Sequence, residues 1–151
     1  MRIALGCDHR GRELKQSLVA YLEAGGHTCE DLGWDDESPV DYPDFAGEVG
    51  RAVTQGRCER GILVCSTGVG MSIAANKVKG VRAALCHDAF TCRRAREHND
   101  ANVLCLGAEV VDVEMAEELV DVFLATKFEG GRHLRRVEKI HQMERAGFLD
   151  T

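Results

Sequence analysis

The sequence lacks the patterns that mark membrane, secreted and metal-clustered proteins. No apolar stretch in its 151 residues approaches the ~18 needed to span a bilayer, and no secretory signal pattern is present. The seven cysteines are odd in number and never spaced Cys-x-x-Cys, which argues against a disulfide framework, a zinc site and a thioredoxin-type motif. We therefore expect a cytoplasmic protein whose cysteines are mostly core thiols.

The chain also lacks an excess of positive charge. Its net charge of -6 disfavours nucleic acids and anionic membranes as partners. Basic residues nevertheless gather in two places, Arg93, Arg94 and Arg96, and Arg132, Arg135 and Arg136. Local clusters of this kind in an acidic protein predict a small anionic ligand.

No repeat, low-complexity tract or linker interrupts the chain, so we expect one domain over residues 1–151. Strand-like runs at residues 3–6, 28–32, 62–65, 81–86 and 103–106 alternate with helical patterns that end near residue 24 and cover residues 45–55, 72–77, 89–98 and 113–126. A last helix is expected at residues 133–146. This order predicts an α/β fold: a doubly wound, five-stranded parallel sheet in a Rossmann-like three-layer sandwich with an extra C-terminal helix.

Ligands of such folds bind beyond the carboxyl ends of the strands. This rule predicts one crevice formed by three turns: residues 7–11, residues 65–70 and the region after Leu106. In the second turn, Cys65 ends a buried strand, and Ser66-Thr67-Gly68-Val69-Gly70 follows it. Backbone N–H groups at such a turn favour a thiolate or a developing oxyanion. The alternative is that Cys65 is a small core residue and the glycines only form a turn.

The other polar groups also have two interpretations. The first turn fits neither a dinucleotide fingerprint nor a Walker A loop, so Asp8 and His9 are candidate ligand-binding groups, although Asp8 is also a plausible helix N-cap. His98 is a candidate proton-transfer group or a histidine interacting with its helix C-terminus. Arg132 and Arg136 are four residues apart, which suits a phosphate clamp or a solvated basic face.

Taken together, five motifs resemble ribose-5-phosphate isomerase type B and its relatives, the galactose-6-phosphate isomerase subunits. They are Gly6-Cys7-Asp8-His9, Asp41-Tyr42-Pro43-Asp44, the run from Cys65 to Lys77, His98-Asn99-Asp100 and Gly130-Gly131-Arg132-His133. The resemblance extends over nearly the whole chain. It implies an aldose–ketose isomerase that converts ribose 5-phosphate to ribulose 5-phosphate through a cis-enediolate, without metal or other cofactor. It also implies a homodimer, or a tetramer of such dimers, with sites between two subunits.

The resemblance assigns roles to individual residues. It implies Cys65 as the base, Thr67 with neighbouring amides as the anion hole, and His98 as the group that opens the sugar ring. The implied substrate contacts are Asp8, His9, Tyr42, Ser66, Gly68, Val69, Gly70, Asn99, Arg132 and Arg136. Either His98 or the C-terminal arginines should then come from the partner chain.

The sequence departs from the family pattern at two positions, of which the first is a small change that keeps the backbone N–H and only the second concerns substrate choice. Ser66 and Glu109 stand where many members have glycine and arginine. A carboxylate at position 109 would repel a phosphate or pair with an arginine elsewhere. Another four- to six-carbon sugar phosphate, such as allose 6-phosphate, galactose 6-phosphate or a tetrose phosphate, is therefore an alternative substrate. A non-catalytic sugar-phosphate-binding module on the same fold is a second hypothesis.

Overall fold

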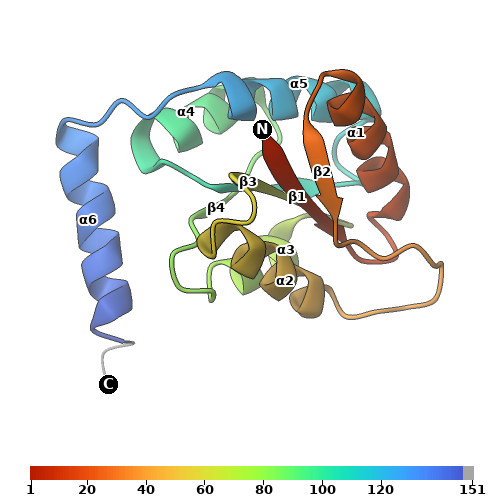
Figure 1. Ribbon diagram of the computed structural model, residues 1–151, viewed down its shortest axis with the longest axis horizontal. Coiled ribbons are helices and arrows are strands. Elements are labelled where there is room, and N and C mark those ends of the chain that lie inside the picture. The colour runs from red at the N-terminus through yellow and green to blue at the C-terminus, as the bar shows by residue number, and fades with distance from the viewer. Residues whose placement is uncertain (148–151) are drawn as a thin grey trace.

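The structure, a computed structural model, describes residues 1–147 (Figure 1). The predicted domain extends to Thr151, and its last four residues lie outside the described part. The strands are β1 (Arg2–Cys7), β2 (Thr28–Asp31), β3 (Arg60–Cys65), β4 (Ala83–Leu85) and β5 (Val103–Gly107). The helices are α1 (Arg12–Ala24), α2 (Tyr42–Thr54), α3 (Val69–Ala75), α4 (Ala89–Asn99), α5 (Val113–Ala125) and α6 (Arg132–Arg145).

All five strands are parallel, in the order β2-β1-β3-β5-β4. Helices α1, α4 and α5 cover one face of this sheet, and α2 and α3 cover the other (Figure 1). The chain moves outward from β1 to β2 and then returns to the other side of β1 for β3. Ligands of doubly wound sheets bind where the strand order reverses in this way, so the ends of β1 and β3 mark the expected crevice.

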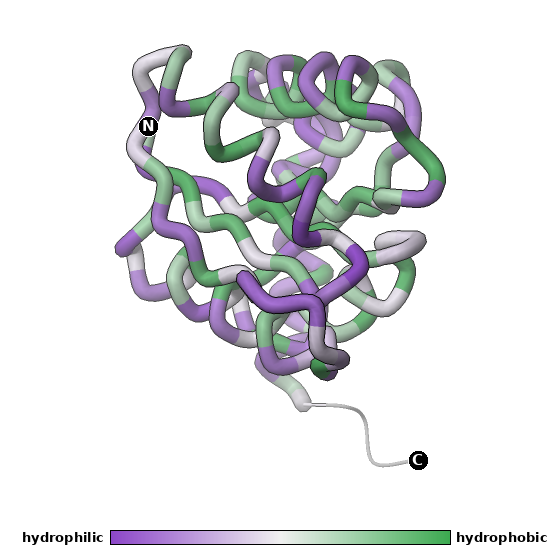
Figure 2. The backbone as a smooth tube through the Cα atoms, turned by 90° about the vertical axis from the view of Figure 1, so that its right-hand side faces the viewer, coloured by the Kyte–Doolittle hydropathy of each residue, from purple (hydrophilic) through white to green (hydrophobic). Residues whose placement is uncertain are grey.

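The strands are buried on both faces, and alternate side chains therefore enter two separate cores. Ile62 and Val64 face α1, α4 and α5, whereas Leu63 and Cys65 face α2 and α3. The helices alternate hydrophobic and hydrophilic residues along the chain (Figure 2), as expected for elements with one face on the sheet. The predicted three-layer fold is confirmed.

The predicted boundaries of three elements differ most from the structure. The fourth strand has three residues rather than six, because Val81 belongs to the turn after α3, where its N–H donates to Val78 O at 3.0 Å. Helix α2 begins earlier than predicted, because Pro43 is well suited to a first helical turn. Helix α3 begins at Val69, directly after Gly68, which adopts a left-handed conformation (φ 78°).

Helix α6 extends away from the two helical layers at one side of the molecule (Figure 1). Its far end approaches the residues that precede β4: Arg82 Nη1 lies 2.8 Å from His141 Nε2, and the Gly80 N–H donates to Glu144 Oε1 at 2.7 Å. Helix α6 therefore lies at the amino edge of the sheet, opposite to the expected crevice. No helix within residues 1–147 is long and apolar enough to cross a membrane.

Candidate active site

Three turns meet at the carboxyl edge of the sheet, as the strand pattern predicts. The Asp8 N–H donates to Val64 O at 3.4 Å, which joins the first turn to β3. The Ala108 N–H donates to Cys65 O at 2.8 Å and the Glu109 N–H to Ser66 O at 3.0 Å, which joins the third turn to the second. The backbone itself therefore assembles the crevice.

This close approach depends on two glycines. A Cβ atom on Gly107 would lie 2.6 Å from the carbonyl oxygen of Thr67, and one on Gly68 would lie 2.9 Å from the carbonyl carbon of Leu106. Gly68 also has a positive φ, which any other residue adopts only with strain. Side chains at either position would push the turns apart.

Cys65 lies at the centre of this edge, with 5% of its surface exposed. Its sulfur accepts the Gly68 N–H at 3.2 Å, and Thr67 Oγ1 accepts the Val69 N–H at 3.3 Å. The Gly68 N–H was expected to face an oxyanion, but in this structure it donates its hydrogen bond to the Cys65 sulfur. Thr67 itself is exposed, so its side chain can be reached from outside.

Two further predicted residues lie in or against the turns at this edge. The Tyr42 ring lies against Gly70, where an added Cβ atom would come within 2.6 Å of the ring. Asp8 is buried and accepts the N–H groups of Arg10 and Gly11, each at 3.0 Å. It does not act as the N-cap of α1, which begins after Gly11 without a side-chain cap. Asp8 instead shapes the first turn.

His9 and Glu109 complete the carboxyl edge. His9 Nδ1 accepts the Val40 N–H at 3.3 Å, so Nε2 carries the proton in the neutral ring. Glu109 accepts a hydrogen bond from the Ser66 hydroxyl and forms an ion pair with Arg10 at 3.1 Å. The Ser66 hydroxyl, followed by Arg10, holds the pKa of Glu109 below its ordinary value. The two departures from the family pattern, Ser66 and Glu109, are thus direct partners.

The remaining predicted residues lie at the amino edge. His98 and Asn99 end α4, and the carbonyl of Asn99 accepts Arg82 Nε at 3.0 Å, next to the start of β4. Arg132 and Arg136 are exposed on the first turns of α6, and neither has an ion-pair partner within residues 1–147. His98 is held there by His133 of α6, whose ring stacks on it at a centroid separation of 4.0 Å.

One chain therefore contains two half-sets of predicted site residues: one at the carboxyl edge of the sheet, around Cys65, and one at the amino edge, around His98. β5 has five residues, so at about 3.3 Å per residue the two edges of the sheet are separated by roughly 16 Å. His98 cannot reach a sugar bound at Cys65 of the same chain.

The basic cluster at residues 93–96 is largely structural rather than ligand-binding. Arg96 is 3% exposed, and its guanidinium donates to Asp100 Oδ1 at 2.8 Å and to Ala101 O at 2.6 Å. Arg94 pairs with Glu97 at 2.8 Å. Two of the three arginines of this cluster are thus paired with acidic residues, whereas Arg132 and Arg136 on α6 have no acidic partner in the described chain.

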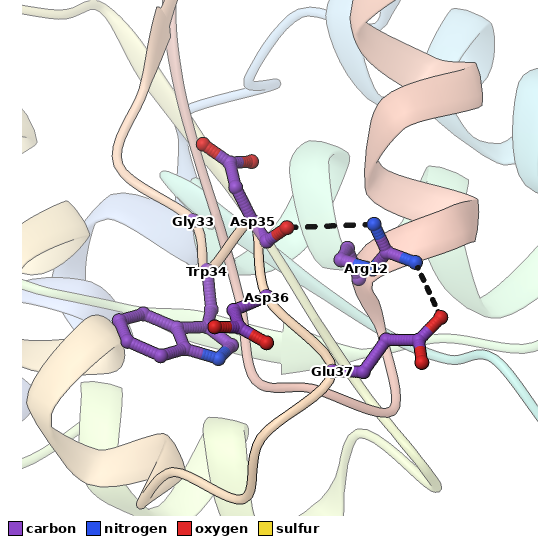
Figure 3. A pocket seen from close by; sticks show the side chains of 6 residues that line it. All are labelled: Arg12, Gly33, Trp34, Asp35, Asp36 and Glu37. Atoms are coloured by element: carbon purple, nitrogen blue, oxygen red, sulfur yellow. Dashed lines mark hydrogen bonds and ion pairs between the residues drawn. The ribbon is translucent and has the colours of Figure 1, made fainter.

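A hollow of about 680 Å³ is lined by residues that were not predicted as site residues (Figure 3). It is lined by Arg12 of α1 and by residues 33–37 of the loop after β2. The Arg12 guanidinium is already bound, to Asp35 O at 3.4 Å and to Glu37 Oε1 at 3.2 Å. Three acidic side chains border the hollow, so it does not suit a phosphate.

The sequence interpretation missed three residues. Arg10 lies in the same turn as Asp8 and His9, and that position was its only signal. His133 was part of a quoted motif but received no role. Glu129, which precedes that motif, has a carboxylate oxygen 3.4 Å from His133 Nε2.

Comparison with known proteins identifies the family. The model of the ribose/galactose isomerase family matches residues 3–140. The chain belongs to the ribose/galactose isomerase family. Ribose-5-phosphate isomerase B of Escherichia coli is 46% identical over 143 residues, covering 95% of this chain and 96% of the relative.

Other members of the ribose/galactose isomerase family agree in fold and differ in name. The solved structure of Clostridium thermocellum ribose-5-phosphate isomerase B has a TM-score of 0.95 at 48% identity, covering 96% of this chain and 98% of that one. A Pectobacterium atrosepticum relative, 44% identical and covered to 95% in both chains, is named D-erythrulose-4-phosphate isomerase. The chain is thus a sugar isomerase, and the names of its relatives include more than one sugar phosphate.

Proposed function

We propose that the protein interconverts ribose 5-phosphate and ribulose 5-phosphate through a cis-enediolate, with Cys65 as the base. The observation that carries this proposal is the position of Cys65 at the end of β3, between the turns that follow β1 and β5. Its sulfur has a backbone N–H donor and an exposed hydroxyl neighbour, Thr67, on the side that a substrate can reach. The high identity to ribose-5-phosphate isomerases supports the same choice.

A second copy of the chain would complete the site. The phosphate and the ring oxygen of a bound sugar need His98, Asn99, Arg132 and Arg136, and these lie together at the far edge of the sheet. A homodimer that places the amino edge of one chain on the carboxyl edge of the other would bring both half-sets to one substrate. Exposed apolar side chains on α3 and α6, including Ile73 at 60% and Met143 at 71%, support burial of these helices by a partner.

The reaction would then proceed in three stages: ring opening, removal of the proton from C2 and protonation of C1. The partner's His98 would accept the proton of the C1 hydroxyl and return a proton to the ring oxygen, which breaks the C1–O bond and exposes the aldehyde. The Cys65 thiolate would take the proton from C2, and the electron pair of that bond would form the enediolate with charge on O1. Thr67 and nearby N–H groups would stabilise this charge. The proton on O2 would then move to O1, and the Cys65 thiol would give its proton to C1, which forms the ketose and restores the thiolate.

Glu109 is the main reason to test other sugars. Its charge lies beside Ser66, directly after the base, where it would disfavour a phosphate. Because its ion pair with Arg10 offsets this charge, the carboxyl edge would hold the sugar and the arginines of α6 the phosphate. A four- to six-carbon sugar phosphate other than ribose 5-phosphate is the second candidate substrate, and the Pectobacterium relative favours testing a tetrose phosphate.

The test is ketose formation by the wild-type protein and by Cys65→Ala. Ribose 5-phosphate, unphosphorylated ribose and four- and six-carbon aldose phosphates should be compared side by side. We expect turnover of ribose 5-phosphate that Cys65→Ala abolishes without a change in thermal stability above a few degrees. Cys29→Ala, which removes a half-buried thiol of β2, is the matched control. Full activity of Cys65→Ala would refute the cysteine base, and turnover of another sugar alone would correct the substrate.

A further inference from the structure

Three side chains form a cluster at the amino edge. His98 lies one residue before the end of α4, Glu129 lies in the connection to α6, and His133 is the second residue of α6. The rings of His98 and His133 stack with an interplanar angle of 9°, and His133 is 5% exposed. The connection is anchored, because the Glu129 N–H donates to Glu97 O at 3.0 Å. Ring stacking, burial and a backbone hydrogen bond therefore hold the cluster together.

The donor types would suit a transition metal, but their arrangement does not. The ligand atoms lie within 4.8 Å of one another, whereas Zn–N bonds of about 2.0–2.1 Å in a tetrahedral site bring ligand atoms to roughly 3.3 Å. The lone pairs of an imidazole lie in the plane of its ring. Since the two planes are nearly parallel, those lone pairs do not converge on one point.

We propose that His133 and Glu129 are positioning residues for His98, and that they act on the opening of the sugar ring alone. This inference rests on the proposed function, in which His98 transfers the protons of that step. His98 is half-buried at a helix end, and the stacked ring of His133 covers one of its faces. The plane of the His98 ring is thereby set, and proton transfer needs its nitrogen within hydrogen-bond reach of the sugar oxygen.

Glu129 holds His133 in turn. Its carboxylate oxygen lies 3.4 Å from His133 Nε2, and its negative charge favours a proton on that nitrogen and a ring orientation that faces the carboxylate. Burial lowers the pKa of His133, and the positive charges of His98 and Arg132 lower it further. A neutral His133 can stack on a protonated His98 without repulsion between two cations.

The two halves of the reaction can be measured separately. Ribose 5-phosphate must open its ring before C2 can lose a proton. Ribulose 5-phosphate has no free hydroxyl at C5, because the phosphate occupies it, and so cannot close a five-membered ring on its C2 carbonyl. Exchange of its C1 hydrogen for solvent deuterium therefore reports enolisation by Cys65 without ring opening.

The experiment compares kcat for ribose 5-phosphate with deuterium exchange at C1 of ribulose 5-phosphate, both with a chelator present. We expect His133→Ala to lower kcat about tenfold, in line with a modest misplacement of the proton donor, and to leave exchange within about twofold. His133→Phe, which keeps a ring on His98, should recover most of kcat. Glu129→Gln should show a smaller loss of the same kind, and Glu118→Gln, an exposed charge removal on α5, should show none.

Three outcomes overturn the inference. Equal loss of kcat and exchange in His133→Ala would mean a merely structural role, and unchanged kcat would mean no role. Restoration of wild-type activity by added Zn²⁺ after chelation would mean a metal site. Failure of the proposed function would give different results. If His98 did not open the ring, His98→Asn would leave kcat intact, and if Cys65 were not the base, Cys65→Ala would leave deuterium exchange intact.

Discussion

The close approach of the second and third turns can be tested with a single added methyl group. In Gly107→Ala, the new Cβ atom would lie 2.6 Å from Thr67 O, 2.7 Å from its carbonyl carbon and 2.8 Å from its Cα. All three are backbone atoms, so no side-chain rotation relieves the contact. Ordinary contact begins near 3.4 Å, and the Thr67 turn must therefore move by about 0.8 Å relative to β5.

This movement should reduce both the thermal stability and the catalytic rate. Overpacking of this kind costs about 2 kcal/mol, which for a chain of this length lowers Tm by roughly 4–8 °C. A misplacement near 1 Å in a site costs on the order of 10²-fold in rate, so kcat/KM for ribose 5-phosphate should fall by about that factor. The effect on rate should exceed the effect of instability alone, because the assay temperature lies well below Tm.

The assays are differential scanning calorimetry and initial-rate kinetics, with Gly25→Ala as the matched control. Gly25 follows α1 with φ -81°, and the nearest atom to an added Cβ there is 3.4 Å away. It should change Tm by less than about 3 °C and leave kcat/KM unaltered. If Gly107→Ala keeps both Tm and kcat/KM at wild-type values, the argument that backbone contact between these turns builds the site is refuted.

Three further predictions concern single side chains. Burial raises the pKa of Cys7 from its ordinary 9.0 to about 11, so the thiol ionises at lower pH in the unfolded chain than in the folded one. The free energy of unfolding should therefore fall as the pH rises from 9 through 11. Midpoints of urea unfolding measured across that range should fall less in Cys7→Ala than in the wild type. The buried Lys15 side chain bonds two exposed aspartates, which water can solvate once the ammonium group is removed. In urea unfolding, Lys15→Met, which keeps the packed stem, should therefore cost about 1–2 kcal/mol and Lys15→Ala about 3 kcal/mol. Equal costs for the two variants would contradict the packing argument. Glu109→Gln removes a negative charge from the site and frees Arg10, so KM for ribose 5-phosphate should fall with kcat nearly unchanged, and a raised KM would show that the carboxylate binds the sugar.

Local pattern was enough to predict most elements of the fold. Continuous apolar runs identified the buried strands, and helical spacing identified α1 and α5. The errors lie at the bounds of elements, where adjacent strands or residues determine the length. β4 is short because it is an edge strand that pairs only with β5. Tyr42 enters α2 because Pro43 suits a first helical turn.

By itself, the sequence determined the layered α/β fold, the turn at Cys65 and the motifs that carry the family resemblance, because these depend on residues close together in the chain. Only the tertiary structure decided that His98 and the arginines of α6 lie together at the opposite edge of the sheet. A helix that follows a parallel strand returns the chain to the opposite edge of the sheet, so His98 at the end of α4 lies far from Cys65 at the end of β3. The pairing of Glu109 with Arg10 and the stacking of His133 on His98 likewise arise from packing between distant segments, which no local pattern encodes.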